Sequence, residues 1–376
     1  PAVPPATAYV DDNWSAFVLG QFILDADLGT SGNQSAIFGY DAFATVGAGL
    51  TATTASGTVI VNGGTYAETV VSSGTKTIEI TGPDAPQNVT FNSLATVAGQ
   101  GVVLEGSSIL TFGNASATTI AGVISGSGAL IKQGGATVTI TGANTYTGAT
   151  TIQAGALNIQ NPTALGTSLN GTTVAGGATL QLQGAIVVVG ETLSLTGEGL
   201  SNAGGLRSIS GNNSWSGDLT IGYPGSNITR VASDANTLTI SGNININGST
   251  STQFVVQGNG ATTISGVISG GGRFTRSSGG TGVVTLSGNN TYTGGTIVSG
   301  GTLVLDGAKS TTGDTTIGSG TTTLRLTDAN SLGNTASQLL VTGGVPTVQL
   351  WIDGPGSNGT ISLPQSFRGS SGVTTN

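Results

Sequence analysis

Short runs of alternating apolar and polar residues recur along the chain. Four of them are Val138–Thr141, Leu180–Gln183, Leu238–Ser241 and Leu303–Leu305, and Gly, Asn or Ser-Gly turns separate such runs. A period of two, with many β-branched apolar residues, predicts short β-strands. No long segment has the 3.6-residue period of a helix, and the one helix-like stretch is Asp41–Ala55. The pattern therefore predicts an all-β fold with a single short helical segment near its start.

One segment recurs three times. It reads TGANTYTG in the first copy (Thr141–Gly148), SGNNSWSG in the middle copy (Ser210–Gly217) and SGNNTYTG in the third copy (Ser287–Gly294). The copies start 69 (210 − 141) and 77 (287 − 210) residues apart. A second match, ATTIAGVISGSG at Ala117–Gly128 and ATTISGVISGGG at Ala261–Gly272, precedes the outer two copies. A sandwich or barrel also has short strands, but copied units favour a parallel β-helix in which each coil stacks on the last.

The composition excludes several kinds of chemistry. Charged residues make up 7% of the chain, Gly contributes 65 of 376 residues, and Cys, Met and His are absent. Disulfides, Cys or His metal sites, thiolate nucleophiles and Ser-His-Asp triads are therefore excluded. A solenoid accounts for the low charge, because like charges stacked on successive coils would repel. No helix follows Gly270–Gly272, so we interpret these residues as turns with positive φ and not as a phosphate cradle.

The net charge of −8 lies entirely in the first third of the chain. Residues 1–131 hold nine acids and one base, whereas residues 132–376 hold eight of each. An acidic chain with nine bases has no electrostatic footprint for nucleic acid. The longest apolar runs, such as Ala185–Val189, are far shorter than a membrane span. The sequence starts at Pro1 without an initiator Met or a signal peptide, so we expect a processed mature chain or a fragment. Because oxidation-prone Cys and Met are absent, we expect it to be extracellular or at a cell surface.

The outer repeats resemble a known family. Gly122–Ile159 and Gly266–Leu305 are similar to the autotransporter-associated β-strand repeat of bacterial passenger domains. The middle copy is degenerate and has Trp215 where the others have Tyr146 and Tyr292. The resemblance implies a right-handed parallel β-helix on a cell surface, often in an adhesin or a long structural exoprotein.

The start of the chain is similar to a different group. Thr7–Trp14, Phe38–Val46 and Ser56–Val71 resemble the opening of secreted parallel β-helix proteins, in which a short amphipathic segment covers the first coil. Such a cap has a physical purpose, because an uncovered coil exposes apolar ladders and an open strand edge. We therefore predict three regions: an arm and cap at 1–55, the first coils at 56–116, and degenerate autotransporter-type repeats at 117–376.

The densest acidic group lies near the start of the chain, at Asp11, Asp12, Asp25 and Asp27. Carboxylate oxygens of this kind suit Ca²⁺, but neither an EF-hand loop nor a G-G-x-G-x-D nonapeptide is present. A plain acidic surface is therefore favoured over a calcium site. Asn-x-Ser/Thr sequons are also present, and we attribute them to a composition rich in these residues.

Isolated charged residues and three Trp residues complete the candidates. A polysaccharide lyase or hydrolase needs two or three carboxylates, or a carboxylate with Arg or Lys, on one face. We interpret the repeat-region acids as separate solvated turn residues: Glu191, Glu198, Asp218, Asp234, Asp306, Asp314, Asp328 and Asp353. Arg273 and Arg276 are interpreted as a solvated strand edge. We expect core or corner packing, not sugar stacking, from Trp14, Trp215 and Trp351.

These observations predict a non-catalytic extracellular β-helix that is displayed on or shed from a bacterial cell surface as a structural or adhesive module. They name no catalytic, metal or cofactor-binding residue. One alternative is a subunit of a homopolymeric filament or sheath that assembles through the ends of the β-helix or the Pro-rich N-terminal arm. The other is a carbohydrate-active β-helix enzyme. A cell-surface or glycan ligand is the expected partner, besides further copies of the chain.

Overall fold

The computed structural model describes residues 3–24, 26, 35–62, 64–71, 76–80, 88–96, 99–112, 117–222, 227–310, 313–318, 321–327, 331–333, 337–342, 348–352 and 367–369. The chain divides into two compact units, Pro1–Thr173 and Val174–Asn376. This division does not test the predicted boundaries after residues 55 and 116, which stay predictions. No helix in the described ranges is long and apolar enough to span a membrane.

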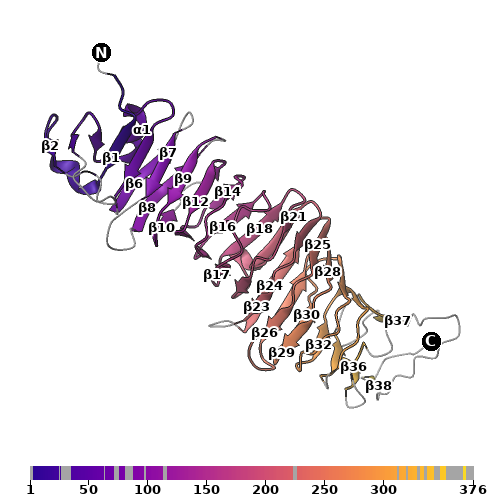
Figure 1. The fold of residues 1–376 in the computed structure, drawn as a ribbon. Coiled ribbons are helices and arrows are strands. Elements are labelled where there is room, and N and C mark those ends of the chain that lie inside the picture. Colours follow the sequence, from indigo (N-terminus) through magenta and orange to yellow (C-terminus); the bar gives the residue numbers. More distant parts are fainter. Residues whose placement is uncertain are drawn as a thin grey trace. The chain divides into compact units, whose positions relative to one another are not determined.

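In the first unit, parallel strands stack on three sides of a coil (Figure 1). Side N1 has the spatial order β12-β9-β7-β5-β1-β4 and consists of β1 (Thr7–Val10), β4 (Ala42–Phe43), β5 (Thr58–Val61), β7 (Thr77–Ile80), β9 (Gly101–Leu104) and β12 (Val123–Gly126). Side N2 consists of β6 (Gly64–Val71), β8 (Asn88–Ala95), β10 (Ile109–Phe112), β13 (Ala129–Lys132) and β15 (Thr150–Ile152). Side N3 consists of β11 (Thr118–Ile120), β14 (Thr137–Ile140) and β16 (Ala156–Ile159). A separate antiparallel pair joins β2 (Phe22–Ile23) to β3 (Ala36–Ile37), and a 3₁₀ helix, η1, spans Asp12–Ala16.

The second unit also has three sides. Side C1 consists of β19 (Val187–Val188), β22 (Asn213–Trp215), β25 (Thr237–Ile240), β28 (Ala261–Ile264), β31 (Val283–Leu286), β33 (Gly301–Leu305), β35 (Thr322–Leu326) and β37 (Val348–Ile352). Side C2 consists of β20 (Leu193–Leu195), β23 (Leu219–Ile221), β26 (Ile244–Ile246) and β29 (Ile268–Gly270). Side C3 consists of β18 (Thr179–Gln183), β21 (Leu206–Ser210), β24 (Ile228–Ser233), β27 (Gln253–Gln257), β30 (Arg273–Arg276), β32 (Thr296–Val298), β34 (Thr315–Ile317), β36 (Leu339–Val341) and β38 (Phe367–Gly369). A short 3₁₀ turn, η2, spans Leu200–Asn202, and β17 (Thr172–Val174) lies at the boundary of the two units.

Parallel pairing of successive coils makes the fold a β-solenoid, which confirms the predicted fold class. Ladders of buried side chains fill its interior, as one register column of side C1 shows. That column contains Leu238, Thr262, Val284, Leu303 and Leu324, each at most 2% exposed. Because inward and outward side chains alternate along a strand, a period of two in the sequence becomes a continuous column of buried, mostly apolar side chains along the stack. The right-handed sense of the coil stays a prediction.

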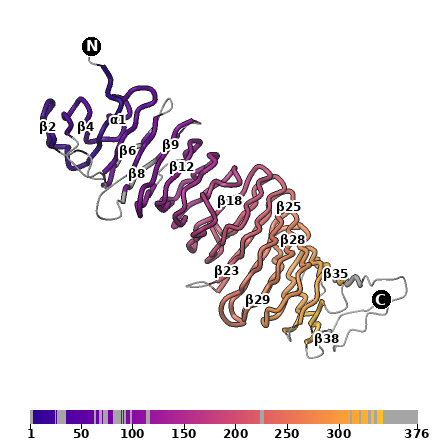
Figure 2. The backbone as a smooth tube through the Cα atoms, in the orientation of Figure 1, coloured from indigo at the N-terminus to yellow at the C-terminus, as the bar shows by residue number. Residues whose placement is uncertain are grey.

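Successive coils of the second unit follow one another along the chain (Figure 2), and they are of two kinds. From β19 to β30 each coil contributes a strand to all three sides, and paired residues such as Val231 and Val256 are 25 positions apart. From β31 onward the described residues form strands on sides C1 and C3 alone, and Val298 pairs with Ile317 after 19 positions. A side of the coil therefore loses its strand inside the unit.

The helix-like stretch contains one helix, α1, at Val46–Ala52, where Thr45 accepts a hydrogen bond from Ala48 N at 3.2 Å as the N-cap. The helix is shorter than the predicted stretch, because residues 42–43 pair with β1 as strand β4. It packs beside β1, β4, β5 and β6, where Gly49 closely approaches Val10 and Val59 (Figure 1). The helix thus lies against the first coil, where the capping segment was expected.

Close backbone stacking explains much of the glycine content. In the second unit, a Cβ on Gly266 would overlap the carbonyl oxygen of Gly242, and a Cβ on Gly288 would overlap that of Gly266. A residue with a side chain therefore cannot occupy this corner without moving the neighbouring coil. Gly270–Gly272 were predicted to need positive φ, and Gly270 has a φ of 101°. At Gly271 and Gly272 the reason for glycine is different, because a Cβ there would overlap atoms of the neighbouring coil.

Candidate functional site

The first and third repeat copies lie where a side of the coil loses its strand. In the first copy, Thr145 N donates to Ile124 O of β12 at 2.9 Å, and β12 is the last strand of side N1. In the third copy, Thr291 N donates to Ile268 O of β29 at 2.8 Å, and β29 is the last strand of side C2. Each copy therefore covers an exposed strand edge without adding a strand of its own.

One Asn in every copy supports this coil-to-coil contact. Its Oδ1 atom accepts a hydrogen bond from a backbone N–H of the preceding coil, and the Asn side chain is buried. The pairs, all at 2.9 Å, are Ile124–Asn144, Ile186–Asn213 and Ile268–Asn290. The degenerate middle copy thus keeps the same link, although its residues 213–215 form strand β22.

The aromatic residue of the motif differs between copies. Tyr146 and Tyr292 are buried, and each hydroxyl lies 2.5 Å from the hydroxyl of the Thr four positions later. Burial raises the pKa of Tyr292 to about 12, against a smaller opposing effect of its hydrogen bond to Thr296. In the middle copy the corresponding pair is Trp215 and Leu219, both buried, and Trp215 Nε1 has no hydrogen-bond partner among the described residues. Trp215 is thus a packing residue, as predicted.

A fully buried cation precedes each outer copy. Arg276, at the end of β30, donates from Nη2 to the Gly280 and Gly282 carbonyls at 2.9 and 2.7 Å, and from Nη1 to Ser277. Burial lowers its pKa, and no carboxylate in the described ranges forms an ion pair with it. The interpretation of Arg276 as a solvated strand edge is wrong, because the turn after β30 folds its carbonyls over the guanidinium.

Lys132 is the equivalent residue before the first copy. Its Nζ donates to Gly134 O at 2.7 Å, to Ala154 O of the next coil at 3.0 Å and to Gln133 O. Burial lowers its pKa to about 8. In both outer copies a buried cation therefore neutralises the carbonyl dipoles of one turn.

Another buried lysine follows the third copy. Lys309 pairs with Asn290 on the preceding coil, donates to Gly313 O at 2.8 Å and lies 4.6 Å from the Tyr292 ring centroid. Burial lowers its pKa to about 8, and the nearby charge of Asp314 opposes that shift.

Two of the N-terminal acids, Asp11 and Asp12, stabilise the fold. Asp11 Oδ1 accepts from Asn13 N at 2.9 Å as the N-cap of η1, and Asp12 accepts from Thr65 N at 3.0 Å. Asp25 and Asp27 lie outside the described residues. Within the described part of the chain no group of three acids could hold a metal ion, so calcium binding stays untested. Trp14 is 7% exposed and belongs to a small core beside these acids, which confirms its predicted packing role.

The acids of the repeat region mostly connect one coil to another. Asp218 accepts from Asn243 N at 2.8 Å, and Asp314 accepts from Gln338 N at 2.8 Å. Glu191 is 3% exposed, so its interpretation as a solvated residue is wrong. Asp328 and Asp353 lie outside the described residues, as does the side chain of Trp351.

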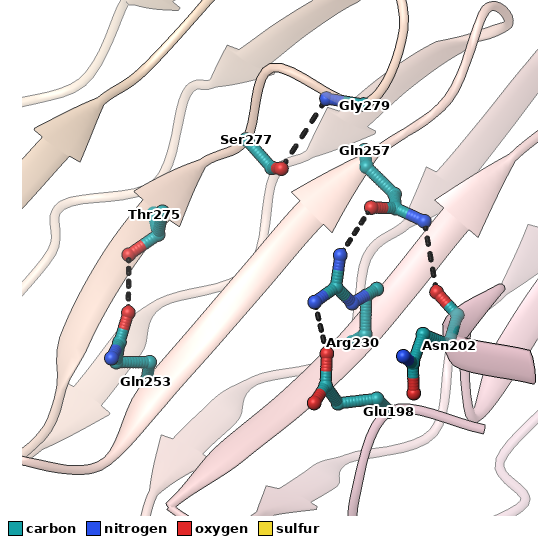
Figure 3. Close-up of polar contacts among 8 residues, drawn as sticks. All are labelled: Glu198, Asn202, Arg230, Gln253, Gln257, Thr275, Ser277 and Gly279. Carbon is teal, nitrogen blue, oxygen red and sulfur yellow. Dashed lines mark hydrogen bonds and ion pairs between the residues drawn. The ribbon is translucent and has the colours of Figure 1, made fainter. Parts of the chain in front are cut away.

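Longer coils of the second unit carry a polar network on the outer face of side C3 (Figure 3). Glu198, from the loop before η2, forms an ion pair with Arg230 of β24, and Arg230 donates to Gln257 of β27 at 2.6 Å. Gln257 in turn donates to Asn202 O at 3.2 Å. A second ion pair joins Arg207 to Asp234 at 2.8 Å. Each acid is thus paired with a cation and does not face a second carboxylate.

A groove of about 520 Å³ lies on the shorter coils after β30. Three successive coils line it with hydroxyl groups and with the backbone of Gly280, Gly300 and Gly301. The hydroxyl residues are Ser278, Thr281, Ser299, Thr302, Thr321 and Thr323. Sequence reasoning missed this groove, because Ser and Thr are frequent everywhere in the chain.

Sequence reasoning also missed the burial of Lys132 and Arg276. A signal was available, because each cation is followed by paired glycines, in KQGG and RSSGG.

Comparison with known proteins agrees with these repeats. The family model described as Passenger-associated-transport-repeat matches residues 130–159 and 279–305, which fall within the two predicted segments. Over 132 residues, or 35% of its length, the chain is 29% identical to the adhesin BmaC autotransporter of Brucella suis biovar 1 (strain 1330). The match spans 4% of that relative. No solved structure matches the chain.

The predicted resemblance is therefore confirmed at the first and third copies, while the middle copy lies outside both matched ranges. The matched ranges contain the buried cations or their carbonyl partners, together with the Asn and Tyr of each motif. The chain carries passenger-associated-transport-repeats and is distantly related to an autotransporter adhesin.

Proposed function

We propose that this chain is part of a passenger displayed at a bacterial cell surface, where it acts as a structural and adhesive module without catalysis. Passenger-associated repeats imply secretion to the cell surface. The observation that carries the proposal is that both matched repeats form stacked coils with the same buried Asn and Tyr contacts, and that each lies beside a buried cation. Such coils present a long lateral surface to a partner.

The distribution of charge supports a non-catalytic role. Hydrolysis or elimination on a polysaccharide requires two or three carboxylates, or a carboxylate with Arg or Lys, that are available to the substrate and not engaged with one another. Here Glu198 and Asp234 are each held by an Arg, and Asp218 and Asp314 each accept a backbone N–H. These acids are therefore engaged in contacts that stabilise coils.

Surface display tests the adhesive role. The chain would be displayed on a non-adherent laboratory bacterium, with an unrelated β-solenoid of similar length as the matched control. We expect adherence to cell layers or glycan-coated plates to rise several-fold over the control. Unchanged adherence at equal display, measured with an antibody, would contradict adhesion. Turnover of a polysaccharide that is lost on Glu198→Gln or Asp234→Asn would contradict the non-catalytic assignment.

An exposed apolar cluster favours a second candidate, a subunit of a homopolymeric filament. The cluster lies around β2 and β3 in the first unit, where Leu19 is 82% exposed. Its large apolar residues are Val3, Val18, Leu19, Phe22, Leu24, Ile37 and Tyr40. Phe22 pairs with Ile37 across β2 and β3, and the Tyr40 hydroxyl donates to Val3 O at 3.0 Å, so several of these residues are neighbours. Exposed apolar residues that gather in this way mark interaction sites, and non-closing contacts between copies produce fibres.

Electron microscopy of material taken from its native surface before any denaturing step tests the filament. Continuous fibres that disperse in the Leu19→Ser/Phe22→Ser variant would support it. Separate particles, together with a monomeric mass in light scattering at high concentration, would contradict it.

A further inference from the structure

Small uncharged side chains form a regular array on the outer face of side C1 in the second unit. The strands β22, β25, β28 and β31 pair in register without a shift, so equivalent residues line up across them. One column of the array holds hydroxyl residues: Ser214, Thr239, Thr263 and Thr285. A second column, two positions earlier on the last three of these strands, holds Thr237, Ala261 and Val283. All of these residues are at least partly exposed.

A third column lies just after the strands and consists of serines: Ser216, Ser241, Ser265 and Ser287. Each serine donates its backbone N–H to a carbonyl of the preceding coil, as Ser265 does to Ile240 O and Ser287 does to Ile264 O, both at 2.9 Å. These backbone hydrogen bonds continue the pairing of the strands and keep the serines in line with one another. The three columns together are called the hydroxyl array below.

Charged residues lie at the borders of the hydroxyl array and not inside it. Asp218 follows Ser216 by two positions, and Asp306 and Arg325 belong to the coils of β33 and β35. The array itself contains neither a charged nor an aromatic residue. Within the described ranges its central hydroxyls, on Thr239, Thr263 and Thr285, have no hydrogen-bond partner, so their hydrogen bonds go to water.

The spacing of the hydroxyl array is close to a spacing in ice. Equivalent residues on neighbouring parallel strands are about 4.8 Å apart, and alternate residues of one strand are about 6.6 Å apart. In a tetrahedral network of hydrogen bonds about 2.75 Å long, two oxygen atoms that share a bonded neighbour are about 4.5 Å apart. Water molecules on one column of hydroxyls therefore take positions close to those of oxygen atoms in an ice surface.

The chemistry of the hydroxyl array argues against other partners. A charged side chain would hold strongly bound water around itself, and the array has none. Aromatic side chains, which supply large flat contact areas, are also absent, so a sugar ring has nothing on which to stack. A polysaccharide chain repeats in one direction, whereas the array and an ice surface both repeat in two.

We infer that the outer face of side C1 from β22 to β31 binds ice, through water molecules that the Thr239, Thr263 and Thr285 hydroxyls hold at lattice positions. Such bridging water is nearly as favourable as a direct hydrogen bond. Water beside the methyl groups of Ala261 and Val283 finds no polar side-chain group there and bonds to other water molecules. This is a further function, and it does not depend on adhesion to cells or glycans.

Partition into ice tests the inference on the full chain. Ice is grown slowly from a dilute protein solution, and the protein concentrations in the ice and in the remaining liquid are compared. The ratio of these concentrations should be at least about tenfold higher for the unchanged chain than for a variant with a charge inside the array. Exclusion of the unchanged chain from the ice would overturn the inference.

Two matched variants locate the binding. Thr263→Lys places a long charged side chain at the centre of the hydroxyl array and should abolish incorporation into ice. Thr316→Lys is the control, because Thr316 is the partly exposed residue of the same Thr-Thr-Ile triplet on β34 of side C3. It should be incorporated like the unchanged chain. Equal behaviour of the two variants, whether retained or lost, would overturn the assignment to side C1.

Circular dichroism confirms that each variant is folded. If Thr263→Lys does not fold, Ser265→Lys makes the same test, because Ser265 is more exposed and belongs to the same array. Adherence to cell layers or glycans is measured without ice, so the adhesive function and the ice-binding function can fail separately.

Discussion

The outer copies and the middle copy of the repeat differ in how they stabilise the same contact. All three use an Asn that accepts a backbone N–H of the preceding coil. The outer copies add a buried cation and a Tyr–Thr hydroxyl pair, and they cover the last strand of a side. The middle copy is itself a strand, has the apolar pair Trp215–Leu219, and lies among longer coils with partly exposed ion pairs. The Asn therefore sets the coil-to-coil link, while the other residues mark where a side loses its strand.

The largest expected effect comes from Arg276→Ala. The change leaves the carbonyls of Ser277, Gly280 and Gly282 without their donor and opens a cavity. Lost donors cost about 1–3 kcal/mol each and a cavity adds to this, so we expect the opening free energy of β30 to fall by at least about 3 kcal/mol. Hydrogen exchange across residues 273–301 measures it.

Arg207→Ala is the control for that experiment, because Arg207 forms a partly exposed ion pair with Asp234 near the middle copy. Such pairs contribute about 0–1 kcal/mol. Equal losses of opening free energy for Arg276→Ala and Arg207→Ala would show that the buried cation contributes no more to stability than the partly exposed ion pair.

The dependence of stability on alkaline pH distinguishes Lys132, the buried cation before the first copy, from Arg276, the buried cation before the third copy. The pKa of Lys132 is lowered to about 8 in the folded chain from 10.5. Between these pH values the unfolded chain binds more protons, so stability rises with pH, by at most about 3 kcal/mol. The pKa of Lys309 is also lowered to about 8, so its titration likewise makes stability rise with pH. Above about pH 10 the unfolded Tyr292 loses its proton first, because its folded pKa is about 12, and stability falls again.

Urea denaturation at pH 7, 8.5, 9.5 and 11 measures this dependence. Lys132→Arg should flatten the rise, because Arg keeps its proton throughout. A stability that falls between pH 8 and 10 would contradict the buried-lysine explanation.

Removal of the shared Asn has an intermediate effect. Asn290→Ala leaves Ile268 N–H buried without an acceptor, and we expect a loss of about 2 kcal/mol in urea denaturation. The exposed neighbour Asn289→Ala is the matched control, with almost no loss. Asn213→Ala should be as costly as Asn290→Ala, and a neutral result there would break the equivalence of the copies.

The smallest effect concerns the aromatic pair. Tyr292→Phe removes one partner of a buried hydroxyl pair and should cost about 1 kcal/mol. The Tyr292→Phe/Thr296→Val double variant should recover most of that loss, because it copies the apolar character of Trp215–Leu219. A double-mutant cycle measures the coupling, and strictly additive losses would argue against a direct Tyr–Thr interaction.

Much of this arrangement was predictable from local pattern. The alternating runs at Leu238–Ser241 and Leu303–Leu305 form strands, and the outer repeats match the expected family. Trp14 and Trp215 pack inside, as an isolated Trp usually does. The burial of Glu191 was not predictable from local pattern, and the burial of Arg276 had no signal besides the paired glycines in the turn that follows it.

The sequence by itself determined the strands, the stacked architecture and the kinship with passenger repeats, because a period of two and a copied unit are local properties. Only the tertiary structure decided which side loses its strand, why Gly266 and Gly288 must be glycine, and that Thr302 and Thr323 line one groove. These features arise from contacts between residues about 20 positions apart. Their geometry depends on coil length, which the insertions between copies change.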